Sequence, residues 1–553
     1  MAGKDDNISQ DVKGLHEMGY AQELSRRMGP FQSFAVSFSI ICIISGGLAS
    51  FPIAMSTAGP WAATIGWVLG GIYALIVAAS LGQIASSYPT AGSLYHWSTI
   101  LGGRFWGWLT AYVNLLGLLF VIPAVNVILY TFIRDLFFAG MLGQDVSGWT
   151  NTTMFIWVAA ISAAQALLNH FGIRLTTILT DFAGYLILAV TVILIGMFFF
   201  AAPGIDFGKA FALVNTTGPA GGGVAPPTTS LWLAILMAML YPLFTITGFD
   251  ASAHTSEETV DAANTVHKGM LHSVFWSLVF GFALALAMVV ALPALYKGII
   301  ADPKQVMFTK EQMDAIAKAG GASPADMAAL GWSSFTLLFN NLIMPSLLGK
   351  IMAIGIIIAN FLCALAAVTS TSRMIYAFAR DGGLPRFLAS VSPAYRTPVP
   401  AIWFTAILSL IFVIITTPLN AFAALSTGCA MYLYISYGMP IIAGLFAEGK
   451  SWTKFGNFRL GIFSRIFAVI VLLGTIGVTI AGHAFVPSIL GDAAAGTSFV
   501  PGLWIYSLAY LAILVVIWFA FENRRFQGPP VTPEAIAKRQ ADIKAREAAL
   551  ARG

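Results

Sequence analysis

The feature of this chain that most constrains its fold is a series of long apolar runs separated by short segments rich in charge, proline or glycine. A helix needs about 20 apolar residues to cross the hydrocarbon layer of a bilayer, and twelve runs have about this length. They fall near residues 31–57, 61–87, 105–133, 152–170, 175–201, 231–254, 271–296, 345–372, 400–416, 420–446, 465–487 and 500–521. We therefore predict an all-α integral membrane protein with twelve transmembrane helices.

Composition excludes the main alternatives. Of the 553 residues, 58% are hydrophobic and 10% are charged, whereas soluble domains are about 25% charged. Intrinsic disorder requires low hydrophobicity, and a disulfide-stapled module requires many cysteines. The three cysteines, Cys42, Cys363 and Cys429, lie in apolar runs. We expect them to be packing residues, and the sequence predicts no metal site.

The distribution of basic residues predicts the orientation in the membrane. With the N terminus inside, the inner segments hold about three times as many of the 29 Lys and Arg residues as the outer ones, and positive loops stay in the cytoplasm. Both termini are therefore expected in the cytoplasm of a plasma or inner membrane. The net charge of +5 then reflects topology and contact with anionic lipid, and it does not indicate nucleic-acid binding.

Little of the chain is left for soluble domains. The expected organisation is a cytoplasmic N-terminal segment at 1–30, a first five-helix repeat at 31–201, a second at 231–446 with an outer loop at 297–344, helices 11 and 12 at 463–522, and a cytoplasmic tail at 523–553. Within the outer loop, Lys310 to Lys318 is helix-like and is expected to be either a lid over a vestibule or a plain surface helix. Pro533 to Ala551 in the tail is expected to form a solvated helix.

Two of the predicted spans carry matching interruptions. The first is broken at Ser45-Gly46-Gly47-Leu48-Ala49-Ser50 and the sixth at Thr247-Gly248-Phe249-Asp250-Ala251-Ser252. Because five helices separate the breaks, a second five-helix unit would begin from the opposite side of the membrane. Broken helices at corresponding positions of an inverted repeat are typical of a transporter site at the membrane midplane.

The breaks expose backbone groups that must face protein, water or a solute. The second half of the first span begins near Leu48 with its positive end at the midplane, which suits a carboxylate. The second half of the sixth span begins near Asp250, for which two roles stay open. Its carboxylate could cap the half-helix, or it could meet an amine or carry a coupling proton.

Three further residues near these breaks or inside a span are candidates with plainer alternatives. His254 lies one turn after Asp250 and either titrates in a coupling or gating role or is a packing residue. Phe249 is either an aromatic gate or a core residue. Asp181 is the only ionisable residue of the fifth span, and it either acts in coupling or gating or pairs with Arg174.

Four motifs occur in order along the chain, and together they resemble the amino acid/choline transporter branch, which includes 4-aminobutyrate and choline permeases, of the amino acid-polyamine-organocation (APC) superfamily. They are Gly19-Tyr20-Ala21-Gln22-Glu23-Leu24-Ser25-Arg26, Ser87-Tyr88-Pro89-Thr90-Ala91-Gly92-Ser93-Leu94-Tyr95-His96-Trp97, Thr247 to His254 with Glu257-Glu258-Thr259, and Thr371 to Met374 with Ala377 to Gly382. The resemblance implies a LeuT-type fold of two inverted five-helix repeats plus two C-terminal helices.

The same resemblance implies a substrate site at the breaks. Ser45, Gly46 and Gly47 would receive a carboxylate or polar head, and Thr247, Gly248, Phe249 and Asp250 would line the opposite side. Asn114, Asn360 and Tyr432 are further candidates from other spans.

The chain also departs from the family pattern in ways that leave the coupling ion open. Gln83 stands where many relatives carry Glu, and Val266-His267 replaces a frequent Pro. Some proton-coupled relatives place a Lys in the fifth helix, but none occurs between 175 and 201 here. Ser and Thr at 369–372 could serve a sodium site or bond to their own helix. We expect no cofactor, and coupling to H+ or Na+.

The sequence therefore predicts a secondary active transporter that moves a small amino acid or amine, such as 4-aminobutyrate, choline or a polyamine, by alternating access. The alternative is a sensor with a transporter fold, which binds a solute without moving it. An enzyme is not expected, because the motifs of hydrolases, metalloproteases and phosphate-binding enzymes are missing from the sequence. The expected partners are the solute and membrane lipid, and the sequence does not predict an oligomeric state.

Overall fold

A computed structural model describes residues 2–202, 204–292, 331–417, 420–453, 455–486, 488–489, 500–530 and 532–552. Within these residues, eleven helical segments are long and apolar enough to cross a membrane, and one further apolar helix, Leu231–Thr245, is shorter. The prediction of an all-α membrane protein is confirmed. The expected sixth span is shorter than predicted because its helix stops at Thr245. The helix-like stretch Lys310 to Lys318 lies outside the described residues.

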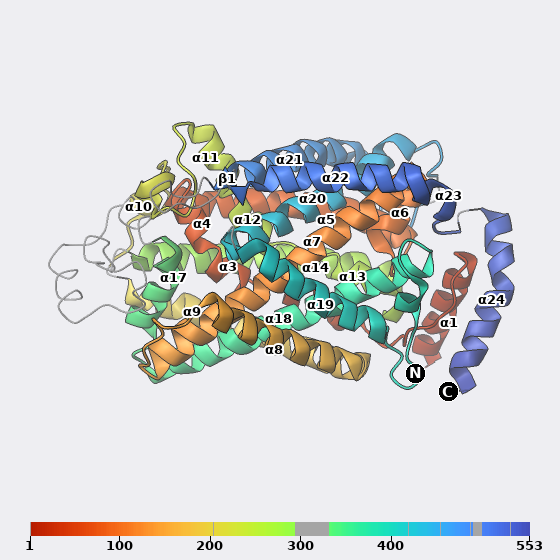
Figure 1. The fold of residues 1–553 in the computed structure, drawn as a ribbon, viewed down its shortest axis with the longest axis horizontal. Coiled ribbons are helices and arrows are strands. Elements are labelled where there is room, and N and C mark those ends of the chain that lie inside the picture. Colours follow the sequence, from red (N-terminus) through yellow and green to blue (C-terminus); the bar gives the residue numbers. More distant parts are fainter. Residues whose placement is uncertain are drawn as a thin grey trace.

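The eleven span-length segments and the shorter apolar helix follow the predicted order along the chain (Figure 1). They are α2 (Pro30–Ile41) with α3 (Gly46–Ala49) and α4 (Phe51–Met55), α5 (Trp67–Ser87), α7 (Arg104–Phe132), α8 (Asn151–His170), α9 (Ile173–Ala201), α11 (Leu231–Ala238) with α12 (Leu240–Thr245), α14 (Ala262–Ala291), α18 (Leu347–Arg380), α19 (Val399–Thr416), α20 (Ala421–Ala447), α21 (Phe463–Phe485) and α22 (Leu503–Ile517). Shorter elements are α1 (Ala2–Glu17), α6 (Ser93–Gly102), α10 (Phe207–Ala210), α13 (Ala251–His254), α17 (Ser334–Leu338), α23 (Asn523–Arg525), α24 (Pro533–Arg552) and the antiparallel pair β1 (Ser488–Ile489) and β2 (Val500–Pro501).

Local sequence sets where several of these helices begin. Thr150 caps α8, Ser230 caps α11 and Ser346 caps α18, and each side chain accepts a hydrogen bond from a backbone N–H three residues later. Such caps satisfy N–H groups that a helix cannot satisfy itself. Proline begins α2, where its fixed φ suits the first helical turn.

Burial separates inner spans from outer ones. Between 72% and 83% of the most apolar window is buried in the first span, α7, α18 and α20, whereas the share is 22% in the span that contains α22, 28% in α8 and 33% in α21. The outer helices present large apolar side chains, such as Tyr185 and Val516, on their exposed faces. This arrangement of an apolar perimeter around a packed centre suits a chain surrounded by lipid.

The two termini lie at the same end of the molecule (Figure 1), which we call the terminal end. There α1 packs on α24, and His16 Nε2 lies 2.7 Å from Glu547 Oε1. The predicted tail helix is therefore present, but it is not solvated on all sides. The polar N-terminal segment, for which no helix was predicted, supplies its partner α1.

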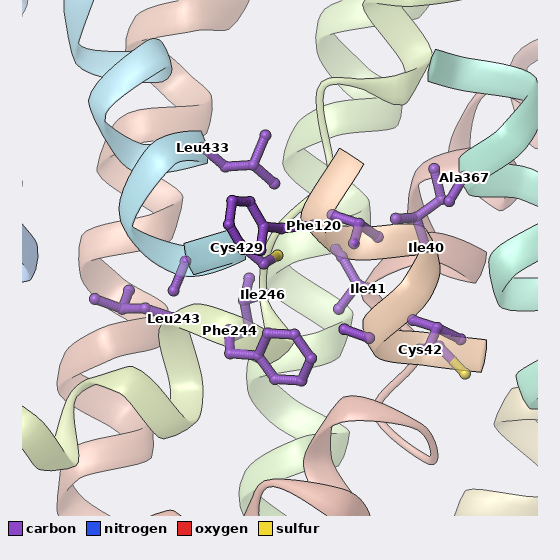
Figure 2. Packing of buried hydrophobic residues seen from close by; sticks show 14 of the residues in the cluster. Ile40, Ile41, Cys42, Phe120, Leu243, Phe244, Ile246, Ala367, Cys429 and Leu433 are labelled. Carbon is purple, nitrogen blue, oxygen red and sulfur yellow. The ribbon is translucent and has the colours of Figure 1, made fainter. Parts of the chain in front are cut away.

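The core surrounds the helix breaks. Figure 2 shows side chains from the first span, such as Ile40 and Cys42, close to Phe244, Ile246 and Cys429. All three cysteines are buried free thiols, as expected for packing residues. The breaks therefore lie in the packed centre of the molecule.

The contact between α5 and α14 provides a test of this packing. Trp67 is fully buried and donates from Nε1 to the Leu278 carbonyl at 3.1 Å. A Cβ added to Gly281 would lie 2.0 Å from Trp67 Cζ2, whereas a Cβ on Gly196 of α9 would meet nothing within 4 Å. Gly281→Ala should therefore lower the melting temperature, since overpacking costs about 1–3 kcal/mol.

Gly196→Ala is the matched control, and it should leave the melting temperature unchanged or raise it, because Ala favours a helix over Gly by up to about 1 kcal/mol. Thermal unfolding of the purified protein in detergent measures both. Equal shifts in the two variants would contradict this packing.

Candidate functional site

The first break lies slightly earlier than the sequence predicted. Helix α2 ends at Ile41, and Cys42 adopts a left-handed conformation with φ of 35°. The Cys42 carbonyl accepts from the N–H groups of Ser45 and Gly46 at 2.7 and 3.1 Å, after which α3 begins. Ser50 then separates α3 from α4. The chain is therefore interrupted over residues 42–45 and again at Ser50.

The second break spans residues 246–250 between α12 and α13. Gly248 has φ of +77°, a conformation that glycine adopts without strain. Tyr434 donates to the Ile246 carbonyl at 2.7 Å, and Gly248 N–H donates to the Tyr437 hydroxyl at 3.0 Å. Two tyrosines of α20 therefore bind backbone groups that the break leaves without helical partners.

The two breaks face each other. A Cβ on Gly46 would lie 3.1 Å from Thr245 Cα, and one on Gly248 would lie 2.3 Å from Ile40 Cγ2. Ser37 of α2 also donates to the Phe249 carbonyl at 2.7 Å. The residues predicted to line the site, Ser45 to Gly47 and Thr247 to Asp250, are therefore brought together.

Two buried polar atoms at this junction have no hydrogen-bond partner among the described residues: Ser45 Oγ and Asn360 Oδ1. The amide nitrogen of Asn360 donates to the Ile44 carbonyl at 3.3 Å, which places this side chain at the first break. Buried polar atoms are normally paired, and the Ser45 hydroxyl also lies near the thiol of Cys363. The other two candidates bind elsewhere, Asn114 to Ser436 and Tyr432 to Ser507.

Asp250 does not cap the half-helix that follows it. Its carboxylate makes no hydrogen bond to the first turn of α13. Instead, Tyr437 donates to Oδ1 at 2.8 Å, and His254 Nε2 lies 3.1 Å from Oδ2. All three side chains are fully buried. Of the two roles proposed from the sequence, the structure therefore disfavours the cap.

The other sequence candidates have distinct surroundings. The ring of Phe249 packs on Tyr437 with centroids 4.8 Å apart and is buried, so in this conformation it is a core residue. Asp181 accepts from Gln32 Nε2 at 2.8 Å. Neither residue belongs to one of the two breaks. Its expected pairing with Arg174 lies outside the described side chains.

A cluster of charges closes the terminal end, and sequence reasoning did not identify it as a site. Arg373 of α18 binds Glu258 through two hydrogen bonds of 3.1 Å, and Arg380 binds Glu257 at 2.9 and 3.0 Å. The two acidic residues follow α13, and the two arginines lie in the C-terminal part of α18. Both pairs fall in the family motifs quoted above, but a motif does not reveal which acid meets which base.

The N-terminal segment and tail extend this cluster. Arg26 donates to the carbonyls of Ser256 and Thr259. Asp381 accepts from Tyr20, Tyr95 and Arg539 of α24, and Glu23 accepts from Tyr376 and Arg546. We call this set, with the pairs Glu257–Arg380 and Glu258–Arg373, the terminal gate.

Burial within the terminal gate shifts the ionisation of neighbouring groups outside the spans. Burial raises the pKa of Tyr20 well above its usual value, and the nearby Asp381 carboxylate raises it further. Burial lowers the pKa of His96 to about 4, so this ring is neutral at physiological pH. Its Nδ1 lies 2.6 Å from Thr90 Oγ1.

Gln83, which stands where many relatives carry Glu, accepts a hydrogen bond from Leu460 N–H at 2.7 Å.

The opposite end contains a cavity of about 850 Å³. Leu48 and Ala49 of the first span, Thr131 of α7 and Phe422 of α20 line it, together with Gln144 of an exposed loop. The cavity thus reaches residues directly after the first break. Within the described residues, the charged pairs close the terminal end and the cavity lies at the opposite end.

The buried pair Glu258–Arg373 provides a test of the terminal gate. Removing one partner of a buried ion pair costs about 3–5 kcal/mol because the other charge is left uncompensated. Arg373→Met should therefore lower the melting temperature strongly. Adding Glu258→Gln removes the orphaned charge and should restore part of the loss, as measured by thermal unfolding in detergent. A double variant that is no more stable than Arg373→Met alone would contradict this pairing.

Comparison with known proteins agrees with this geometry. The family model described as amino acid permease matches residues 28–521. Amino-acid permease BAT1 of Arabidopsis thaliana is 30% identical over 487 residues, covering 84% of this chain and 87% of the relative. The BAT1 homolog of Oryza sativa subsp. japonica is 29% identical over 459 residues, covering 81% and 82%.

Solved structures show the fold. The crystal structure of MhsT in complex with L-phenylalanine aligns with a TM-score of 0.53 and 13% identity, covering 83% of this chain and 99% of that one. This likeness supports the LeuT-type fold with its two broken spans. Together, the match to the family model over most of the chain and the similarity to the plant permeases show that this chain belongs to the amino acid permease family.

Proposed function

We propose that the chain is a secondary active transporter that carries a small amino acid or amine by alternating access. The observation that supports this proposal most directly is the pair of facing breaks. They lie between a sealed terminal end and a cavity that reaches the first break. A solute bound at the breaks would be reached from the cavity, and release on the other side would require the terminal gate to open.

The solute would bind to Ser45, Gly46 and Gly47 on one side and to Thr247, Gly248 and Phe249 on the other. Ser45 Oγ and Asn360 Oδ1 offer hydrogen-bonding atoms that have no partner among the described residues. A carboxylate or another polar head would accept from the serine hydroxyl, and an amine would donate to the amide oxygen. Asp250 contributes less to direct binding in this conformation, since both its oxygens are engaged.

The experiment is uptake of labelled 4-aminobutyrate, choline, amino acids and polyamines into proteoliposomes. We expect saturable uptake of at least one of these solutes. Gly46→Leu should abolish it, since even a Cβ at this position would lie 3.1 Å from Thr245 Cα. Gly196→Leu is the matched control and should transport normally, because its Cβ direction is open.

The outcomes separate the proposal from its alternative. A solute that raises the melting temperature of the purified protein but gives no flux would favour the sensor. No binding and no flux across the panel would refute both. Normal uptake by Gly46→Leu would refute the position of the site. Uptake driven separately by a proton gradient and a sodium gradient would identify H+ or Na+ as the coupling ion.

We further propose that both termini face the cytoplasm of the plasma or inner membrane, with lipid around the apolar perimeter. The cavity would then open to the outside. The support is the excess of Lys and Arg on that side in the sequence and the shared position of the termini (Figure 1). A C-terminal green fluorescent protein fusion expressed in a bacterium should fluoresce, while a C-terminal alkaline phosphatase fusion should be inactive. The reverse pattern would contradict this orientation.

A further inference from the structure

A chain of hydrogen bonds joins the second break to the terminal gate. Tyr437 donates to Asp250 Oδ1, and Asp250 Oδ2 meets His254 Nε2. His254 Nδ1 lies 3.2 Å from the carbonyl oxygen of Ala91. The backbone N–H of Ala91 in turn donates to Glu257 Oε1 at 3.1 Å. Because Glu257 also binds Arg380, the chain reaches from the centre of the molecule to its sealed end.

The geometry of this chain fixes how many protons it holds. The Ala91 carbonyl can only accept, so His254 Nδ1 carries a hydrogen and donates. The contact between Nε2 and Asp250 Oδ2 then requires one more proton between two groups that would otherwise both be acceptors. This proton lies either on the imidazole, beside a carboxylate, or on the carboxyl group, beside a neutral imidazole. With Nδ1 as the donor to Ala91, the pair therefore holds one shared proton.

Other charges near the pair already have partners. On α18, Arg373 binds Glu258 and Arg380 binds Glu257. Arg26 donates to the carbonyls of Ser256 and Thr259 and lies 3.6 Å from Asp11. The titratable groups that face Asp250 from α20 are Tyr437, which donates to it, and the thiol of Cys429. The residues of α2 that bind the second break and α13 are the serines Ser33 and Ser37.

The nearest titratable side chain on α6 is His96, which pairs with Thr90. On α14, the buried His267 stacks on Phe458 and bonds to the Ala263 carbonyl. Among the described residues, none of these groups supplies a free charge that could replace the shared proton.

Loss of the proton would break the chain at a defined point. The Asp250 carboxylate and the lone pair of His254 Nε2 would then face each other about 3.1 Å apart in a buried site, with no hydrogen between them. Two buried acceptors in contact are unfavourable. Relief requires either that His254 leave Asp250 or that its remaining hydrogen move from Nδ1 to Nε2. Both changes disturb the hydrogen bond from His254 to the Ala91 carbonyl, and with it the loop that holds Glu257.

We propose that Asp250 and His254 form a binding site for one transported proton, and that release of this proton loosens the terminal gate through Ala91 and Glu257. The step breaks the N–H or O–H bond that holds this proton and passes H+ to a water molecule at the terminal end, which leaves Asp250 as a carboxylate and His254 as a neutral imidazole. This inference rests on the proposed transport function and selects H+ between the two coupling ions. Both oxygens of Asp250 are taken by hydrogen-bonded side chains, which leaves this carboxylate poorly placed as a sodium ligand.

The test uses two variants and two controls in the full-length protein. Asp250→Asn and His254→Gln keep polar groups of similar size while removing the acid or the titratable ring. Asp206→Asn, at the start of exposed α10, and His272→Gln, on an exposed face of α14, are the matched controls. Thermal unfolding first shows which variants remain folded. Substrate counterflow, which needs no net ion movement, then shows which can still exchange solute.

The transport readout is accumulation driven by an imposed proton gradient. Wild type and both controls should accumulate solute above its equilibrium level. His254→Gln should retain counterflow but lose this accumulation, and Asp250→Asn should also lose the accumulation. Accumulation by either variant at the wild-type level would overturn the proposal. So would wild-type accumulation that responds to a sodium gradient and not to a proton gradient.

A second readout does not depend on transport. Solid-state NMR of protein labelled with 15N-histidine reports the protonation of each ring nitrogen, and the loss of one signal in His254→Gln assigns His254 among the seven histidines. In wild type, Nδ1 should stay protonated and Nε2 should share a proton at neutral pH. In Asp250→Asn, the signature of the shared proton should disappear, while Asp206→Asn should match wild type.

An unprotonated Nδ1, or an unchanged spectrum in Asp250→Asn, would overturn the proton site even if transport is found. The NMR signature with no solute flux in any protein would instead refute the proposed function, and with it the claim that this proton is transported. The two failures are therefore distinguishable.

Discussion

The structure depends on how the backbone groups freed by two broken helices are satisfied inside a membrane-embedded core. Lipid cannot supply partners there, so each group must find one in the protein, in water or in a bound solute. Tyr434, Tyr437 and Ser37 serve the second break, and Asn360 serves the first. The spans that carry these side chains, α2, α18 and α20, therefore pack at the centre.

The two ends of the molecule differ on either side of this centre. Four ionised side chains in two buried pairs hold the segment after α13 against the end of α18, and the two terminal helices add Arg539 and Arg546 to this contact. At the opposite end, a cavity approaches the first break. Within the described residues, one conformation thus combines a closed terminal end with a cavity at the opposite end, an arrangement that suits the alternating access we propose.

Much of the fold could be predicted from sequence because apolar length and glycine-rich interruptions are local signals. The runs gave the spans and their order, and the Ser45–Gly47 and Thr247–Asp250 segments marked the breaks to within a few residues. Helix boundaries were predicted less accurately. Helix α2 ends in a left-handed turn at Cys42, a position where neither glycine nor proline marks the end in the sequence.

Long-range pairings could not be predicted. Asp250 resembled a helix cap because it precedes a half-helix. Its two oxygens instead bind Tyr437, which is 187 residues away in the chain, and His254. Likewise, α1 was not expected as a helix, because its polar sequence becomes informative only when α24 and the terminal gate lie against it. The roles of Ser45, Gly46, Gly47 and their counterparts stay predictions, and so do those of Asp181 and His254.

The central claim is that a solute binds between the two breaks. The most direct measurement is a cryo-electron microscopy structure of the purified protein in nanodiscs, with a saturating concentration of the solute that stabilises it most. The account predicts solute density in contact with Ser45 to Gly47 on one side and Thr247 to Phe249 on the other. Density confined to the cavity near Gln144, with both breaks unoccupied, would contradict it.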